Sequence, residues 1–141
     1  MLKKTITYTD FNDVEHTDDY YFNISPAEFT KMEAREMYMV DGKATGGMSE
    51  RLQRITKGGS GQEIMDTFEQ LLKDSYGVRS EDGQRFVKSE KAWEDFRYSG
   101  AYDEFFMELM TDTDSASNFV NSIMPKKLQD HIKKVEAPKP E

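Results

Sequence analysis

The first 24 residues alternate between polar positions and apolar or β-branched positions. Residues 3–8 follow the two-residue period of a β-strand, and residues 14–24 resume the same extended pattern. Between these two segments, residues 9–13 supply the Asp and Asn side chains that favour a turn. The pattern therefore predicts an N-terminal β-hairpin over residues 1–24.

A helical pattern begins directly after this hairpin. Ser25 can cap the first turn, Pro26 suits the first helical position, and Glu28 completes a capping box. The sequence therefore predicts that a helix begins at Pro26. Its apolar side is formed by Phe29, Met32, Met39 and Val40. We expect a loop with several glycines over residues 41–47 and a short helix over residues 49–55.

The widest apolar stripes lie in the second half of the chain. The clearest helix follows the glycine-rich segment 58–61 and ends before Gly77. Gly77 is placed to end this helix in the left-handed backbone conformation that glycine commonly adopts after a helix. Its apolar side comprises Ile64, Met65, Phe68, Leu71, Leu72 and Tyr76. Two further helical stripes comprise Tyr102, Phe105, Phe106 and Leu109, and then Ala116, Phe119, Val120 and Ile123. We expect the stripes containing Phe68 and Phe106 to pack on each other as the core.

The remaining segments predict shorter elements. Residues 78–87 contain the turn sequence Ser-Glu-Asp-Gly and predict a small hairpin or an extended loop. Ser89 is placed to cap a helix over residues 90–97. Pro125 interrupts the helical pattern and starts a last helix, which continues to residue 135.

Together these elements predict an α+β fold that is mainly α, with the N-terminal β-hairpin packed on a bundle of about five or six helices. A chain of 141 residues has the usual size of one domain. We therefore expect a single domain over residues 1–135, with the hairpin at 1–24 and the helical part at 25–135. Residues 136–141 form a polar tail with two prolines, which we expect to be disordered.

The composition excludes several classes of protein. The chain has no Cys and only two His, so disulfides, thiolate nucleophiles and cysteine-ligated zinc are ruled out. A net charge of −8 argues against binding to a nucleic-acid backbone. No apolar run approaches the roughly 18–20 residues of a membrane span. We expect a soluble protein of a reducing cytosol that binds neither nucleic acid nor membranes.

The sequence contains four features that could suggest a reactive or ligand-binding site, and none of them meets the requirements of such a site. The segment Gly58–Gly61 precedes a helix but lacks the Lys-Ser/Thr pair of a phosphate-binding loop. The run Asp112–Asp114 lacks the Gly and Glu that a calcium loop requires at its sixth and twelfth positions. His16 and His131 have no metal-ligand spacing, and the acidic doublets are typical of a solvated surface. We therefore predict no catalytic residue, no cofactor and no metal.

Methionine is abundant, with nine residues in the chain, and flexible thioether side chains favour surfaces that repack around partners. Met37, Tyr38 and Met107 fall outside the apolar stripes. Apolar side chains in such positions are candidates for contact with another chain. These three residues form our predicted partner-binding set.

Several blocks of the sequence, in one order along the chain, carry a family resemblance: residues 1–11, 21–24, 46–50, 71–77, 80–86, 101–109 and 119–125. Over most of residues 1–128 the chain resembles the tail assembly chaperones of long-tailed bacteriophages. The resemblance implies a non-enzymatic protein that binds the tape-measure protein and helps recruit tail-tube subunits. It also implies a protein of the host cell cytoplasm that is absent from the mature virion.

Members of this family are commonly made in two forms, so the resemblance also implies a longer, frameshifted form as a partner. Lys126-Lys127 and Lys133-Lys134 could each be encoded by a slippery heptamer, although Lys pairs are also common on solvated helices. Self-association into a homo-oligomer stays open. A second hypothesis is an acidic decoy that blocks a host nucleic-acid-binding protein, but the even mixture of basic and acidic residues favours the chaperone.

Overall fold

The computed structural model describes residues 1–40, 42–48, 50–52 and 58–125. The chain divides into two compact units. Unit 1 consists of Met1–Asn23 and Met65–Ile123, and unit 2 contains the described residues of Ile24–Ile64 together with Met124 and Pro125. The prediction of one domain over residues 1–135 stays a prediction. The predicted helix after Pro125 and the predicted tail at 136–141 lie outside the described residues.

A four-stranded antiparallel sheet lies in unit 1, with the strand order β1-β2-β5-β6. The strands are β1 (Leu2–Thr9), β2 (Glu15–Phe22), β5 (Tyr76–Arg79) and β6 (Phe86–Val87). The pairs run from Leu2 opposite Phe22 to Thr9 opposite Glu15, so the predicted N-terminal hairpin is confirmed. The predicted small hairpin over 78–87 is also confirmed, and it extends the first hairpin into a larger sheet.

The two faces of the β1–β2 hairpin differ as the period-2 pattern predicts. Ile6 and Phe22 are buried on the inner face. On the outer face the side chains of exposed residues bond to each other, with Thr5 donating to Asp19 at 2.6 Å and Thr7 within 2.9 Å of Thr17. One face therefore joins the core, and the other is a polar, β-branched surface.

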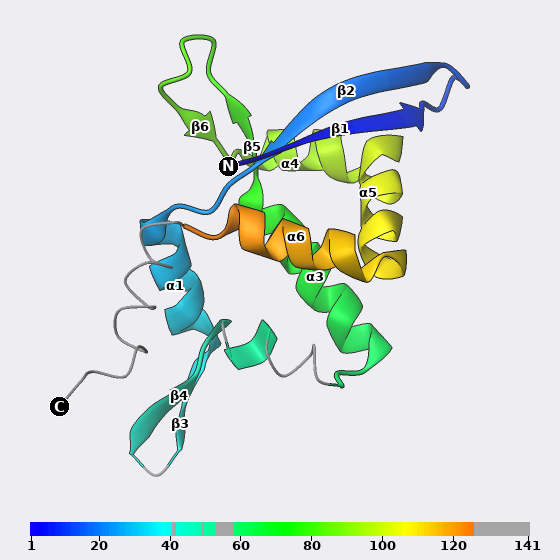
Figure 1. Ribbon diagram of the computed structural model, residues 1–141. Helices are drawn as coiled ribbons and strands as arrows, with labels where there is room; N and C mark the ends of the chain where they lie inside the picture. The colour runs from blue at the N-terminus through cyan, green and yellow to red at the C-terminus, as the bar shows by residue number, and fades with distance from the viewer. Residues whose placement is uncertain (41, 49, 53–57, 126–141) are drawn as a thin grey trace, which may run out of the picture. The chain divides into compact units, whose positions relative to one another are not determined.

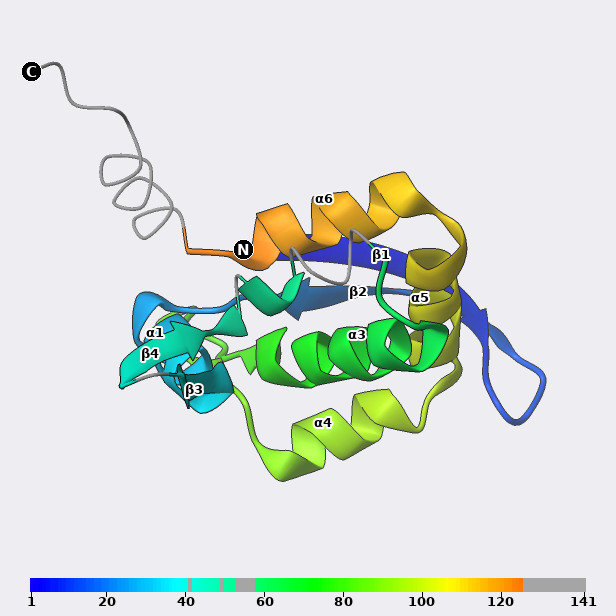
Figure 2. The ribbon, with the colours of Figure 1, turned by 90° about the horizontal axis from the view of Figure 1, so that it is seen from below.

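The described residues of unit 1 also include α4 (Glu90–Arg97), α5 (Gly100–Thr111), α6 (Thr113–Ile123) and the part of α3 (Gly61–Ser75) from Met65 onward. In Figure 2, α5 lies across the ends of α4 and α6, the helices that precede and follow it in the chain. The Ser89 side chain accepts a hydrogen bond from the Ala92 backbone N–H, which confirms the predicted cap of α4. Helices and an antiparallel sheet together confirm the α+β class.

Aromatic rings form the core of unit 1, and Phe22 lies at their centre with no exposed surface. Its ring centroid is 5.3 Å from that of Phe105 and 5.8 Å from that of Phe119. Phe119 on α6 also lies 6.4 Å from Phe68 on α3. These ring contacts link Phe68 on α3 and Phe105 on α5 through Phe119 on α6, and the direct packing of the two stripes stays a prediction. Phe106 is only half-buried.

Gly77 does not end α3 in a left-handed conformation, which corrects the sequence prediction. The helix ends at Ser75, and Gly77 lies in β5. A Cβ atom on Gly77 would come within 2.6 Å of the Phe86 ring. The missing side chain therefore lets the Phe86 ring lie against the backbone of the neighbouring strand.

Unit 2 begins with α1 (Pro26–Glu36), which has the predicted start. The Ser25 hydroxyl accepts a hydrogen bond from the Glu28 backbone N–H, and the Glu28 carboxylate accepts one from the Ser25 N–H. This capping box confirms the predicted helix start. Phe29 and Met32 are buried on α1.

The predicted continuation of this helix to Val40 is wrong, as is the predicted loop over 41–47. The chain instead forms β3 (Met37–Val40) and β4 (Lys43–Gly46), which pair as an antiparallel hairpin. Asp-Gly at 41–42 is the two-residue sequence that hairpin turns favour, and Gly42 has a positive φ of 76°. The turn chemistry outweighed the helical spacing of Met39 and Val40.

The predicted short helix over 49–55 is confirmed at its described residues, because residues 50–52 are helical. The rest of that prediction lies outside the described residues. The Arg51 guanidinium donates to the Glu36 carboxylate at 2.8 Å, which ties this turn to α1 within unit 2. No helix in the described part of the chain is long and apolar enough to cross a membrane.

Candidate partner-binding surfaces

The predicted partner-binding residues belong to two different units of the chain. Met37 and Met107 are exposed, at 46% and 56% of their surface, in β3 of unit 2 and α5 of unit 1. Tyr38 lies in β3, but the direction of its side chain lies outside what the structure describes. Their role in binding stays a prediction.

The turn between β1 and β2 carries a more exposed apolar group that the sequence reasoning missed. Phe11 is 83% exposed and Val14 is 51% exposed. Both views show this turn projecting beyond α5 in unit 1. We call residues 10–14 the hairpin tip. Phe11 within a segment of Asp and Asn was the available signal, but the sequence pattern assigned residues 9–13 only to a turn and Val14 to the strand that follows.

Asp10 holds the backbone of the hairpin tip in place. Its carboxylate accepts hydrogen bonds from the backbone N–H groups of Asn12, at 2.8 Å, and Val14, at 3.0 Å. The Asp10 N–H donates to the Val14 carbonyl at 2.8 Å, and the Asp13 N–H donates to the Asp10 carbonyl at 3.0 Å. Asp13 takes the left-handed conformation, with φ at 61°, which Asp tolerates better than most residues. The tip is a closed turn with defined geometry.

Side chains on the hairpin strands extend this network. The second carboxylate oxygen of Asp10 lies 2.6 Å from Nε2 of His16, whose ring stacks on Tyr8 at 5.3 Å. The hydrogen bond with His16 and those with backbone N–H groups hold the pKa of the Asp10 carboxyl below its ordinary value. Asp10 is therefore ionised across the physiological pH range, and His16 has a structural role.

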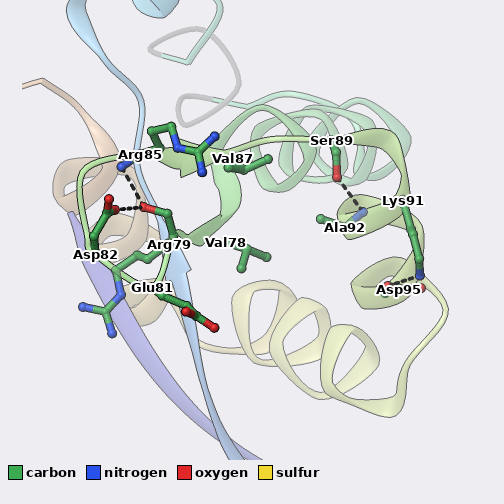
Figure 3. Close-up of a pocket in the computed structure, with 11 residues that line it drawn as sticks. Val78, Arg79, Glu81, Asp82, Arg85, Val87, Ser89, Lys91, Ala92 and Asp95 are labelled. Carbon is green, nitrogen blue, oxygen red and sulfur yellow. Dashed lines mark hydrogen bonds and ion pairs between the residues drawn. The ribbon is translucent and has the colours of Figure 1, made fainter.

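A second apolar surface lies between the β5–β6 hairpin and α4 (Figure 3). This hollow of about 700 Å³ has Val78, Val87 and Ala92 among its lining residues. Val78 and Val87 pair across the two strands and expose 46% and 39% of their surface. Three basic and three acidic residues complete most of the lining, so the formal charges balance. The hollow can accept an apolar group, but its charge favours neither sign of partner.

Hydrogen bonds within the turn that borders this hollow shape its wall. The Ser80 hydroxyl donates to Asp82 at 2.6 Å and accepts from the Arg85 backbone N–H at 3.0 Å. On α4, the Lys91 ammonium lies 2.9 Å from the Asp95 carboxylate. The polar rim is therefore largely engaged in contacts of its own.

Neither surface has the features of a reactive site. Within the described ranges, no group of three or more His, Asp or Glu side chains is placed to hold a metal. The run Asp112–Asp114, considered above as a calcium loop, lies at the start of α6. The Asp112 carboxylate caps this helix, because it accepts hydrogen bonds from the backbone N–H groups of Asp114 and Ser115 at 3.0 and 3.3 Å. The described surfaces offer apolar contact and charge, which are the means of protein binding.

Comparison with known proteins assigns the chain to a family. A family model described as phage tail assembly chaperone matches residues 1–141, the whole chain. No curated protein and no solved structure matches it. The family match agrees with the resemblance of the sequence blocks, and it accords with exposed apolar groups on a small acidic protein. The chain therefore belongs to the phage tail assembly chaperone family.

Proposed function

We propose that this protein is a non-enzymatic chaperone that binds the tape-measure protein before tail assembly and helps recruit tail-tube subunits. The observation that carries this proposal is the family match over the whole chain. Exposed apolar side chains at the hairpin tip and on α5 support it, because a binder of a long apolar client needs such groups. The net charge of −8 would keep the complex in solution.

The proposed site of action is the host cell cytoplasm, and the protein is proposed to leave the tail before the virion matures. A longer, frameshifted form of the chain is a proposed additional partner. The nucleotide sequence tests this point, because a slippery heptamer near Lys126 or Lys133 with an overlapping open frame would support it. A coding sequence with neither feature would remove the long form from the proposal.

The direct test is co-expression with the tape-measure protein encoded by the same phage genome. We expect the chaperone to raise the soluble fraction of the tape-measure protein and to co-purify with it. Co-expression with an empty vector is the control. A tape-measure protein that neither gains solubility nor co-purifies would contradict the proposal.

Met37, Tyr38 and Met107 are proposed to contribute to client contact. Replacing all three with Ser should weaken tape-measure binding, because apolar contact is lost. The free energy of unfolding should change little at the exposed Met37 and Met107, by about 0.5 kcal/mol or less each. Co-purification yield and thermal melting measure the two effects separately, and unchanged binding would remove these residues from the site.

A further inference from the structure

We infer that the hairpin tip is the anchor by which this protein binds the tape-measure protein, with Phe11 inserted into an apolar pocket bordered by basic side chains. This inference rests on the proposed function, and it goes beyond it by naming the contact surface and the chemistry of its partner.

The exposure of Phe11 is the first step. Single exposed apolar residues are common on protein surfaces and need no explanation by themselves. Phe11 differs because it is a large aromatic, 83% exposed, with Val14 also exposed only three positions away. Aromatic side chains are the groups that most often dominate the energy of protein interfaces. Both views place this turn beyond α5, where a partner can reach it (Figures 1 and 2).

The rigidity of the tip is the second step. Asp10 accepts two backbone N–H groups and contacts the His16 ring, so the turn that carries Phe11 is held from both strands. A group that is already in its bound conformation loses less conformational entropy on binding. Five hydrogen bonds are centred on Asp10, three on its carboxylate and two on its backbone. The network fixes the backbone from which the Phe11 side chain projects.

The charge around the tip defines the partner. Asp13 and Glu15 are exposed on either side of Val14, and the chain as a whole carries a net charge of −8. Long-range attraction therefore favours a pocket with Lys or Arg at its rim, and repulsion disfavours a second acidic copy of this chain. The hollow at Val78 and Val87 has balanced lining charges and gives no comparable preference.

The test compares two exposed aromatics in the same unit. Phe11→Ser removes the anchor, and Tyr98→Ser removes an aromatic that is 71% exposed at the C-cap of α4. Each variant is co-expressed with the tagged tape-measure protein, and the captured amount is measured against wild type. We expect Phe11→Ser to lower the affinity at least about 10-fold and Tyr98→Ser to leave it unchanged. Phe11→Trp should restore capture.

The contribution of the acidic residues at the hairpin tip is tested by the same capture experiment. The double variant Asp13→Lys with Glu15→Lys should weaken capture and reduce its dependence on salt concentration. Glu81→Lys, at the exposed β5–β6 turn, is the matched control and should behave as wild type. Thermal melting of every variant separates loss of binding from loss of fold.

The outcomes separate this inference from the function on which it rests. Failure of the wild type to capture the tape-measure protein overturns the proposed function and the inference with it. Equal capture by wild type and a folded Phe11→Ser variant overturns the inference alone. Loss of tail-tube binding with unchanged tape-measure capture would also overturn it, because the tip would then serve a different partner.

Discussion

The backbone carbonyl oxygen of Thr9 lies 2.7 Å from the position that a Cβ atom on Gly100 would occupy. Thr9 ends β1, and Gly100 begins α5. The start of α5 therefore packs directly against the end of β1. The hairpin tip begins at the next residue of the chain, Asp10. The absence of a side chain at Gly100 permits this approach.

Gly100→Ala should destabilise the protein by about 1–3 kcal/mol, because the neighbouring atom belongs to the backbone and cannot rotate away. Gly61→Ala is the matched control at the start of α3, where a Cβ atom would meet nothing within 4 Å. Gly61→Ala should be neutral or stabilise by about 0.4–1 kcal/mol. Chemical denaturation of both variants checks this prediction, and equal effects would contradict it.

Phe22→Ala should be among the most damaging core substitutions in unit 1, at about 3–5 kcal/mol. Its ring contacts four other aromatic rings, so its removal leaves a cavity where β2 meets α4, α5 and α6. Phe106→Ala should cost less than about 3 kcal/mol, because that ring is half-buried and stacks on Tyr102 near the surface. The two unfolding midpoints measure the difference, and an equal loss would show that the ring cluster is not the centre of the core.

Acid should loosen the hairpin tip before it unfolds the core. The pKa of the Asp10 carboxyl is lowered in the folded state, mainly by its hydrogen bond with the His16 ring. The stability that this carboxylate contributes is therefore present above the ordinary Asp pKa and is lost as the pH falls through the lowered value. A carbon-detected NMR titration should give Asp10 a pKa below that of free Asp. Asp10→Asn should remove this titration, and an ordinary pKa would contradict the tip geometry.

Alkaline pH should destabilise the aromatic core. Burial raises the pKa of both Tyr76 and Tyr102 to about 12. The neutral phenols therefore contribute stability that is fully present below about pH 10, the ordinary Tyr pKa, and that is lost as the pH rises towards about 12. Ultraviolet absorbance of tyrosinate, followed together with circular dichroism, measures ionisation and unfolding. Full tyrosinate formation near pH 10 in the folded protein would contradict this prediction.

Local chemistry made much of the secondary structure predictable. The capping box at Ser25 and the cap at Ser89 lie within a few residues of the N–H groups they satisfy, so the sequence alone was sufficient. The N-terminal hairpin followed from its alternating pattern in the same way. Asp-Gly at 41–42 was an equally local signal, and the β3–β4 hairpin was missed because helical spacing received more weight.

The sequence by itself determined the local elements and the family. Tertiary structure decided how those elements meet, because that depends on contacts between residues far apart in the chain. Phe119 on α6 contacts both Phe68 on α3 and Phe105 on α5, and only the tertiary packing of α6 brings the three rings together. Positions 77 and 100 require glycine because the Phe86 ring and the Thr9 carbonyl oxygen lie close to their backbones. These close approaches become visible only in the folded chain. The exposure of Phe11 likewise appears only in the folded chain, because it depends on which other elements reach the hairpin tip.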